Sequence, residues 1–172
     1  MADCIIKSRN AVRAEIFGLK LSFTSKLILL RSTPHDHTEF QFSERYGNLS
    51  FSSTLQDDSK GTRFKAIMYR HQDERWDDVI VRMTNKQEDR AYNEAVRMLG
   101  MKYDLIGQLS HISKASIWQP SKKRIWCTKA VGRVAYAGRP DFKIFLDMFD
   151  LTTELIPSQM DIMARYYFKS NP

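Results

Sequence analysis

Cysteine is scarce in this chain of 172 residues, where Cys4 and Cys127 are the only two. Two cysteines are too few for a disulfide framework, and no Cys-x-x-Cys pair gives the spacing of a zinc site. Nothing in the sequence argues for a bridge between the two. The sequence therefore predicts neither a disulfide-stabilised domain nor a bound metal or other cofactor.

Long apolar runs are also missing: no stretch approaches the roughly 18 consecutive apolar residues of a membrane-spanning helix. The opening residues 1–7 lack the basic region and apolar core of a secretory signal. We therefore expect no transmembrane segment, and a protein that is cytoplasmic or delivered by a non-classical route, for example in a virus particle.

The chain has no internal repeat, no low-complexity segment and no evident linker between domains. Its hydrophobic content of 42% and charged content of 27% are ordinary for a globular protein. These features predict a single domain over residues 1–172, in which residues 1–24 either join the core or form an N-terminal extension. They do not indicate an oligomeric state.

The charge is basic, with 27 Lys and Arg against 20 Asp and Glu and a formal net charge of +7. Such a charge could attract nucleic acid, anionic lipid or an acidic polymer such as cell-wall material. The basic residues are scattered along the chain, and no helix-turn-helix, zinc finger or glycine-rich phosphate loop accompanies them. Charge alone therefore selects no partner.

The first half of the chain carries strand patterns. Residues 37–42 alternate in polarity, which puts Phe40 and Phe42 on a core face and His37, Glu39 and Gln41 on the opposite one. Three further short segments have strand character: 49–54, 63–69 and 78–83. Strands this close in sequence predict an antiparallel meander of about five to six strands.

Helical spacing takes over in the second half. Thr84 with Gln87 fits a capping box, and Gly100 sits where a C-terminal cap belongs. The apolar face expected between them is Ala91, Tyr92, Ala95, Val96 and Leu99. Further helices are expected at 103–112, after Cys127, at 142–149 and from Pro157 to about Phe168, with a loop over 113–123. The predicted class is α+β, an antiparallel sheet packed with helices.

Cys127 begins or just precedes one of these helices. The apolar residues from it onward, Cys127, Ala130, Val131, Val134 and Ala135, have the spacing of one packed helix face. A helix N-terminus and the cations of 122–124 both favour a thiolate, which is the condition for a nucleophilic cysteine. On this stretch alone, a small buried apolar cysteine is the competing interpretation.

A nucleophilic cysteine needs an imidazole to share its proton, and the chain offers four histidines. His35 sits in a Pro-His-Asp turn, His71 precedes a run of polar residues, and His111 is near a helix end. Only His37 is expected on a strand, on the face opposite the core phenylalanines. The residues alone leave open whether His37 is a base or an exposed strand histidine.

Several short motifs occur in an order that resembles a known family. They are Ser25-Lys26-Leu27-Ile28, Thr33, His37-Thr38-Glu39-Phe40, Leu49-Ser50-Phe51-Ser52-Ser53, Gly61-Thr62-Arg63-Phe64-Lys65, Trp76-Asp77, Gly100-Met101-Lys102-Tyr103-Asp104-Leu105-Ile106-Gly107, Trp126-Cys127 and Ile156-Pro157. Together they resemble the circularly permuted NlpC-type papain-fold proteins of the YiiX-like branch, over residues 25–160. In that family the histidine strand precedes the cysteine helix. The resemblance implies a permuted papain-like (NlpC-like) fold for this domain.

The resemblance also implies roles for particular residues. Cys127 would be the nucleophile and His37 the general base, with backbone N–H groups of the cysteine helix stabilising an oxyanion. The third catalytic residue stays open between Glu39, which we favour slightly, and Ser52 or Ser53 on the next strand. Tyr103, Trp126 and Ser52 are expected to line the substrate pocket, although a core tyrosine explains Tyr103 equally well.

What such a site would act on follows from the resemblance alone. It implies a thiol-dependent hydrolase of amide bonds, acting on a peptide or peptidoglycan-like substrate such as a stem peptide. Alternatives are an acyl-ester or thioester hydrolase or acyltransferase with the same Cys and His, or a silent structural module, for example in a virion. Family members often carry Ser-Glu after the cysteine, whereas this chain has Thr128-Lys129, so its local charge and substrate are expected to differ.

Overall fold

The computed structural model describes residues 1–11, 13, 26, 29, 34–55, 60–66, 75–108, 123–149 and 155–171. They form an α+β fold, in which a five-stranded antiparallel sheet packs against helices, as the sequence predicts. The strands are β1 (Ala2–Asn10), β2 (His35–Gln41), β3 (Leu49–Ser53), β4 (Thr62–Ala66) and β5 (Trp76–Met83). The helices are the 3-10 helix η1 (Glu44–Tyr46) and the α-helices α3 (Asn85–Met98), α5 (Cys127–Gly138), α6 (Pro140–Asp147) and α7 (Pro157–Ser170).

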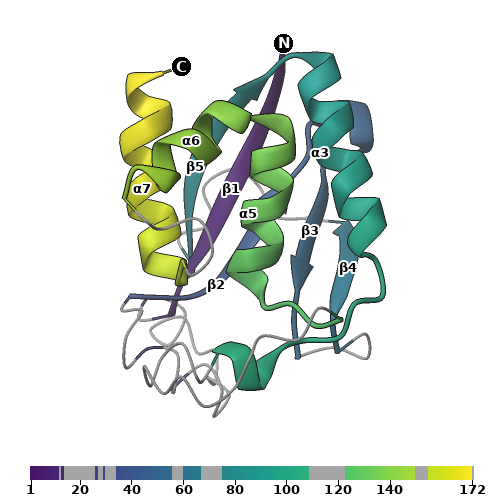
Figure 1. Cartoon of the computed structure of the whole chain (residues 1–172), viewed down its shortest axis with the longest axis vertical. Coiled ribbons are helices and arrows are strands. Elements are labelled where there is room, and N and C mark those ends of the chain that lie inside the picture. Colours follow the sequence, from purple (N-terminus) through teal and green to yellow (C-terminus); the bar gives the residue numbers. More distant parts are fainter. Residues whose placement is uncertain are drawn as a thin grey trace.

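The sheet has the order β4-β3-β2-β1-β5, so the predicted meander is only partly right. Strands β2, β3 and β4 follow one another as neighbours, but β5 pairs with β1 at the opposite edge. Figure 1 shows β1 running through the middle of the molecule. Because β1 pairs with both β2 and β5, residues 2–10 belong to the sheet and are not an N-terminal extension.

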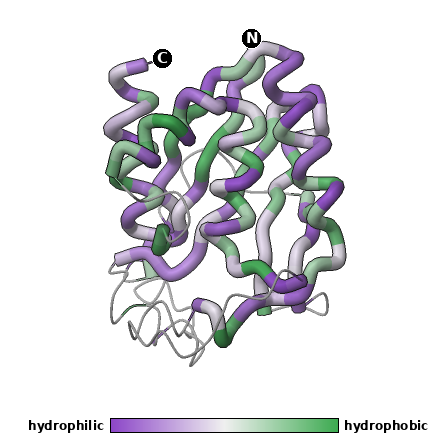
Figure 2. Tube along the Cα trace, viewed as in Figure 1, coloured by the Kyte–Doolittle hydropathy of each residue, from purple (hydrophilic) through white to green (hydrophobic). Residues whose placement is uncertain are grey.

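The core lies between one face of the sheet and the helices that cover it (Figure 1). In register across the strands, Ile6 pairs with Phe40 on one side and Val79 on the other, and Phe40 pairs with Phe51. All four side chains are buried, and Figure 2 shows hydrophobic residues concentrated along the central strands. Burial of this apolar surface is the main force that holds the helices on the sheet.

Strand β2 begins at His35, two residues before its predicted start, and it is mostly buried on both faces. Phe40 and Phe42 lie in the core as expected, but Glu39 and Gln41 on the opposite side are buried too. His35, which was expected in a turn, is the first strand residue. Polar side chains near the site are therefore screened from water rather than displayed on an open sheet face.

Helix α3 has the predicted capping box: Gln87 N donates to Thr84 Oγ1 at 3.3 Å, and Thr84 N donates to Gln87 Oε1 at 2.7 Å. Gly100 follows the helix with a left-handed φ of 79°, which suits glycine. The predicted apolar face is partly wrong, because Val96 and Leu99 are exposed and Met98 is buried instead. In Figure 2 the helix is mostly hydrophilic, with hydrophobic residues at intervals.

The remaining helices agree with their predictions where the structure describes them. All five predicted apolar residues of α5 are buried, and Pro157 opens α7. The helix predicted over 142–149 is observed as α6, over Pro140–Asp147. Of the helix expected at 103–112, residues 105–108 are helical. The rest of that helix, nearly all of the 113–123 loop, His71 and His111 lie outside the described residues.

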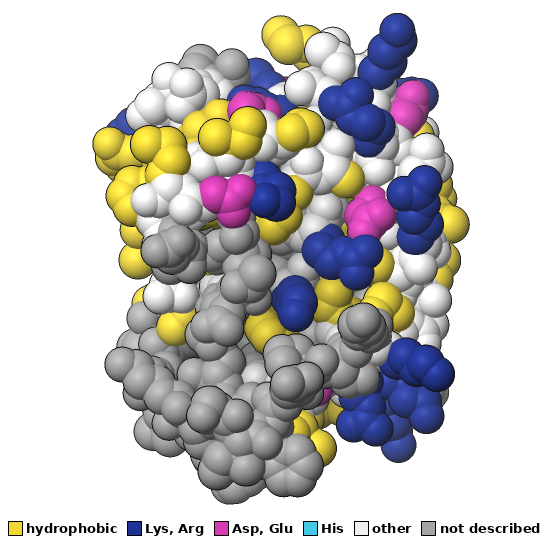
Figure 3. All heavy atoms as spheres, viewed as in Figure 1, with side chains coloured by type: hydrophobic (Ala, Val, Ile, Leu, Met, Phe, Trp, Pro, Cys, Tyr) yellow, Lys and Arg dark blue, Asp and Glu magenta, His cyan; other side chains and the backbone are white. Residues whose placement is uncertain are grey.

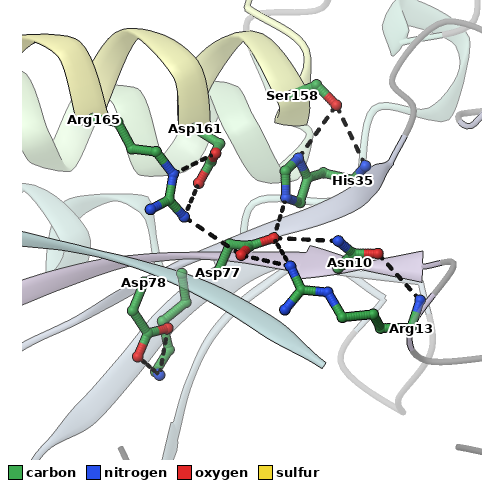
Figure 4. Close-up of polar contacts among 9 residues, drawn as sticks. Asn10, Arg13, His35, Asp77, Asp78, Ser158, Asp161 and Arg165 are labelled. Atoms are coloured by element: carbon green, nitrogen blue, oxygen red, sulfur yellow. Dashed lines mark hydrogen bonds and ion pairs between the residues drawn. The ribbon is translucent and has the colours of Figure 1, made fainter. Parts of the chain in front are cut away.

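A polar cluster around Asp77 joins α7 to the end of the sheet, as Figure 4 shows. His35 Nε2 lies 2.7 Å from Asp77 Oδ2, and its Nδ1 lies 3.4 Å from Ser158 Oγ near the start of α7. Arg13 donates to both oxygens of Asp77, at 2.7 and 2.8 Å, and Arg165 of α7 lies 3.5 Å from Oδ1. Burial raises the pKa of Asp77, but the hydrogen bonds from His35 and Arg13 outweigh it and hold the pKa below its usual value.

Candidate active site

Cys127 is the first residue of α5, and its side chain is fully buried. The preceding residue, Trp126, is the N-cap in an extended conformation and gives no side-chain cap to the first turn. Backbone N–H groups at such a helix start have no partner within the helix, and the helix dipole makes this end positive. The sulfur therefore sits where an anion is favoured.

His37 on β2 contacts this sulfur. The Cys127 thiol and the His37 ring interact, and the two groups shift each other's pKa in opposite directions. Burial raises the pKa of Cys127, but the hydrogen bond from His37 and its positive charge outweigh burial, so the pKa lies below that of a free thiol. Burial lowers the pKa of His37, but its bonds to Cys127 and Glu39 raise it to about 9.

Glu39 also contacts the imidazole of His37. Its Oε1 is 3.3 Å from His37 Nε2, and its Oε2 accepts a 2.7 Å hydrogen bond from Ser50 Oγ. Burial raises the pKa of Glu39, yet the bonds from His37 and Ser50 and the charge of Arg63 lower it to about 2. A charged carboxylate therefore contacts His37 at neutral pH.

The two serines considered as alternatives to Glu39 face other partners. Ser52 Oγ donates to the Thr38 carbonyl at 2.6 Å, and Ser53 Oγ donates to the Ile125 carbonyl at 2.7 Å. Both hydroxyls hold backbone next to the site, since Thr38 adjoins His37 on β2. The cross-strand serine that reaches Glu39 is Ser50, which the sequence analysis did not single out.

Tyr103 also reaches Cys127, from the segment between α3 and residues 105–108. Its Oη donates to Gln108 Oε1 at 2.5 Å, and Cys127 is near enough to affect the pKa of the hydroxyl. Burial first, and then the charge of Cys127, raise the pKa of Tyr103 well above its usual value, so the hydroxyl keeps its proton. Sequence reasoning missed Gln108, because a single polar residue in a short helical segment carries no distinctive pattern.

An ion pair between two neighbouring residues of β1 and β2 borders the site. Arg9 pairs with His37 in the strand register, and its guanidinium donates to Asp36 at 2.9 Å and 2.6 Å. Burial lowers the pKa of Arg9, but Asp36 raises it above its usual value, helped by the charges of Glu39 and Cys127. Neither residue was predicted, because β1 was not recognised as a strand.

The residues that follow the cysteine are Thr128 and Lys129. Thr128 is buried, with its Oγ1 3.8 Å from Cys127 Sγ, and this contact helps to lower the pKa of the thiol. The Lys129 ammonium lies 5.0 Å from the centre of the Trp126 ring, within the range of a cation–π contact. The Trp126 side chain is itself buried.

In the described part of the chain, no three His, Cys, Asp or Glu side chains are grouped so that they could hold a metal ion. In the same residues, no helix combines the length and apolar character needed to cross a membrane.

Comparisons with known proteins do not extend this description: no family model matches the chain, and neither a curated protein nor a solved structure matches it. The fold and the site define an α+β protein in which a cysteine at a helix N-terminus interacts with an imidazole from the sheet.

Proposed function

We propose that the protein is a thiol-dependent hydrolase that cleaves an amide bond. The single observation that carries this proposal is the interaction of Cys127, at the start of α5, with His37 of β2, which puts the thiol pKa below and the imidazole pKa above the ordinary values. A pair shifted in these directions favours thiolate and imidazolium at neutral pH, which is the resting state of an activated cysteine nucleophile.

The remaining contacts suggest a role for each neighbour. With Nε2 on Glu39, Nδ1 is the ring nitrogen left to share the thiol proton, and Glu39 orients the ring. In the proposed reaction Cys127 attacks the carbonyl carbon and forms a thioester, while His37 gives its proton to the leaving amine. His37 then removes a proton from the water that attacks the thioester, and the C–S bond breaks, which releases the acid and regenerates the thiolate and the imidazolium.

The oxyanion formed in each attack needs hydrogen-bond donors. The uncapped backbone N–H groups at the start of α5 are a source of such donors. A peptidoglycan stem peptide as substrate, and the permuted papain-like fold itself, rest on the family resemblance. An acyl-ester or thioester would use the same two catalytic residues.

The complete burial of Cys127 favours a second candidate, a catalytically silent binding module that retains the site. In that case the polar contacts around the sulfur only stabilise the fold. The two candidates differ in whether a reagent reaches the thiol in the folded protein.

Alkylation by iodoacetamide as a function of pH tests the proposal, with each cysteine followed by mass spectrometry. We expect Cys127 to react well below pH ~8.5, where a free thiol titrates, and His37→Ala to remove this advantage. Cys4 is an internal control in the same chain, because burial and the nearby Glu88 raise its pKa. It should stay unlabelled in the folded protein.

Two results would contradict the proposal. If labelling of folded Cys127 follows the titration of an ordinary thiol, His37 does not activate the cysteine and the proposal is wrong. No labelling at any pH, when the urea-denatured chain reacts normally, supports the silent module. If the thiol is activated, turnover of cell-wall peptides compared with acyl esters separates an amidase from an acyl hydrolase.

A further inference from the structure

The two edge strands of the sheet that the described residues form, β4 and β5, differ in length and in charge. β4 has five residues, among them Arg63 and Lys65, and like charges on a short strand discourage pairing with another chain. β5 has eight residues and no proline, and it pairs with β1 over its whole length in an unbroken register. A long and regular edge strand such as β5 can accept a further strand.

A groove with a volume of about 770 Å³ lies between β5 and α7, and Ile80, Ile162 and Tyr166 contribute to its lining. These three side chains are 51%, 62% and 67% exposed, which is unusual for large apolar groups that lie close together. Figure 3 shows hydrophobic side chains gathered at the upper left of the molecule, over α6 and α7. A strand that lies in the groove would cover these side chains and remove their apolar surface from water.

The charges on one face of β5 are arranged symmetrically about Ile80. Asp78, Ile80 and Arg82 share the face of the strand opposite to the residues that enter the core, because side chains alternate along a strand. Figure 4 shows Asp78 on the opposite side of the sheet from Asp77 and α7. This face therefore has an acid two residues before the isoleucine and a base two residues after it.

We propose that β5 pairs with β5 of a second copy of this chain, antiparallel and centred on Ile80, so that the two sheets join into one. The two-fold axis passes between the two Ile80 residues, as in other interfaces that use the same patch of both subunits. In this register Asp78 of each copy lies opposite Arg82 of the other, so an attractive cross-strand pair forms twice. This charge complementarity selects a second copy as the occupant of the groove. The inference does not depend on the proposed function.

Both charged residues are able to make this contact. Asp78 pairs with Lys7 at 2.8 Å, and a carboxylate has enough lone pairs to accept from Arg82 as well. Arg82 lies 3.9 Å from Asp3, and these two side chains are 49% and 66% exposed, so a closer partner can replace this contact. The Arg82 carbonyl accepts from Arg139 at 2.8 Å, and its second lone pair is able to accept from a neighbouring strand.

Sedimentation velocity of the full chain over a range of concentrations tests the proposal. The wild type should change from monomer to dimer as its concentration rises. Ile80→Lys puts two ammonium groups side by side at the axis, and should raise the dissociation constant at least about a hundredfold. Val96→Lys is the matched control, because Val96 is also a partly exposed apolar residue, on α3, and this variant should dimerise like the wild type.

Disulfide trapping tests the register of the two strands. Directly opposed residues of antiparallel strands have Cα atoms about 4.5–5.5 Å apart, within the range that a disulfide spans. Ile80→Cys should therefore form a covalent dimer under mild oxidation with diamide. The two copies of Arg82→Cys lie four residues apart along the strand, at least about 13 Å, and should stay uncoupled. Mass spectrometry of the linked peptides separates the introduced thiols from Cys4 and Cys127, which are buried.

Three results would overturn the inference. The first is a wild type that stays monomeric at all concentrations. The second is a dimer that Ile80→Lys weakens no more than Val96→Lys does, because the copies then meet through another surface. The third is trapping through Arg82→Cys as efficient as through Ile80→Cys, which is incompatible with a register centred on Ile80.

Discussion

Glu39 illustrates how strongly single residues are coupled in this site. The carboxylate is buried among β-strands, a position that would ordinarily favour its neutral form. The ring of His37 and the hydroxyl of Ser50 reverse that preference, and the pKa falls to about 2. Because the folded pKa is below that of an unfolded chain, charged Glu39 stabilises the fold above about pH 4.5, and this stability is lost as the pH falls toward 2.

Acid should therefore destabilise the wild type more than a variant that cannot titrate at position 39. Between pH 5 and pH 3 the wild type should lose about 2 kcal/mol more of its free energy of unfolding than Glu39→Gln, which cannot titrate at this position. Urea denaturation at each pH measures the difference. Parallel pH dependence of the two proteins would show that Glu39 does not retain its charge in the fold.

At the scale of the elements, the backbone pairing of Gly61 with Lys102, next to Tyr103, depends on the glycine. A Cβ on Gly61 would overlap the Met101 carbonyl oxygen, so the segments that carry Lys60 and Lys102 could not approach as closely. Gly100 is different, because its φ of 79° favours glycine while the space beside it is open. The two glycines therefore serve two separable needs, close approach and backbone conformation.

Alanine at the two positions should separate these needs. Gly61→Ala is expected to cost about 2–3 kcal/mol of stability through overlap, and to shift the NMR signals of Tyr103. Gly100→Ala should cost only about 1 kcal/mol, from the left-handed backbone. Urea denaturation and amide spectra of both variants measure this. If Gly61→Ala lowers the free energy of unfolding no more than Gly100→Ala does, the pairing of Gly61 with Lys102 tolerates a side chain.

Elements differ in how far the sequence reveals them. The capping box of α3 and the buried face of α5 are local patterns, because their partners lie within a few residues of one another. Strand β1 has no such pattern, because the polar residues Lys7 and Ser8 are both buried in it. Lys7 is buried together with an ion-pair partner, since its ammonium lies 2.8 Å from Asp78 of β5. A strand in the middle of a sheet, with polar residues paired on its neighbours, loses the alternation by which strands are recognised.

At the scale of the whole molecule, α7 is joined to the sheet by polar contacts as well as by its apolar face. Asp77 is the centre of these contacts, since it accepts from His35 and Arg13 and pairs with Arg165 of α7. Figure 4 shows groups from β1, β2, β5 and α7 converging on this carboxylate. Trp76, the preceding residue, contacts the His37 ring edge-to-face with their centroids 6.2 Å apart, so the cluster adjoins the His37 side chain of β2.

Asp77→Asn should therefore lower the free energy of unfolding by about 2 kcal/mol, because several charge-assisted hydrogen bonds weaken together. Hydrogen exchange should become faster in α7 than in α3. Asp147→Asn is the control, since Asp147 pairs with Lys143 on an exposed helix surface and such pairs contribute about 0–1 kcal/mol. Equal effects of the two substitutions would show that the cluster does not hold α7.

The local chemistry of the site could be predicted from the sequence. A cysteine at a helix start, a histidine on a strand and a glutamate two residues from it are each specified by short-range patterns of polarity and spacing. The α+β class follows from the same patterns. These local structures are stabilised by neighbours within one helical turn or one strand pair, so they can be predicted without knowing the fold.

Other features depend on contacts between distant segments. Three pairs join residues that no local pattern connects: Ser50 with Glu39, Gln108 with Tyr103, and Arg9 with His37. The position of β5 beside β1 decides which polar groups meet at Asp77. Tertiary packing decided these features because desolvation and charge act through space, and the sequence does not give the distances over which they act.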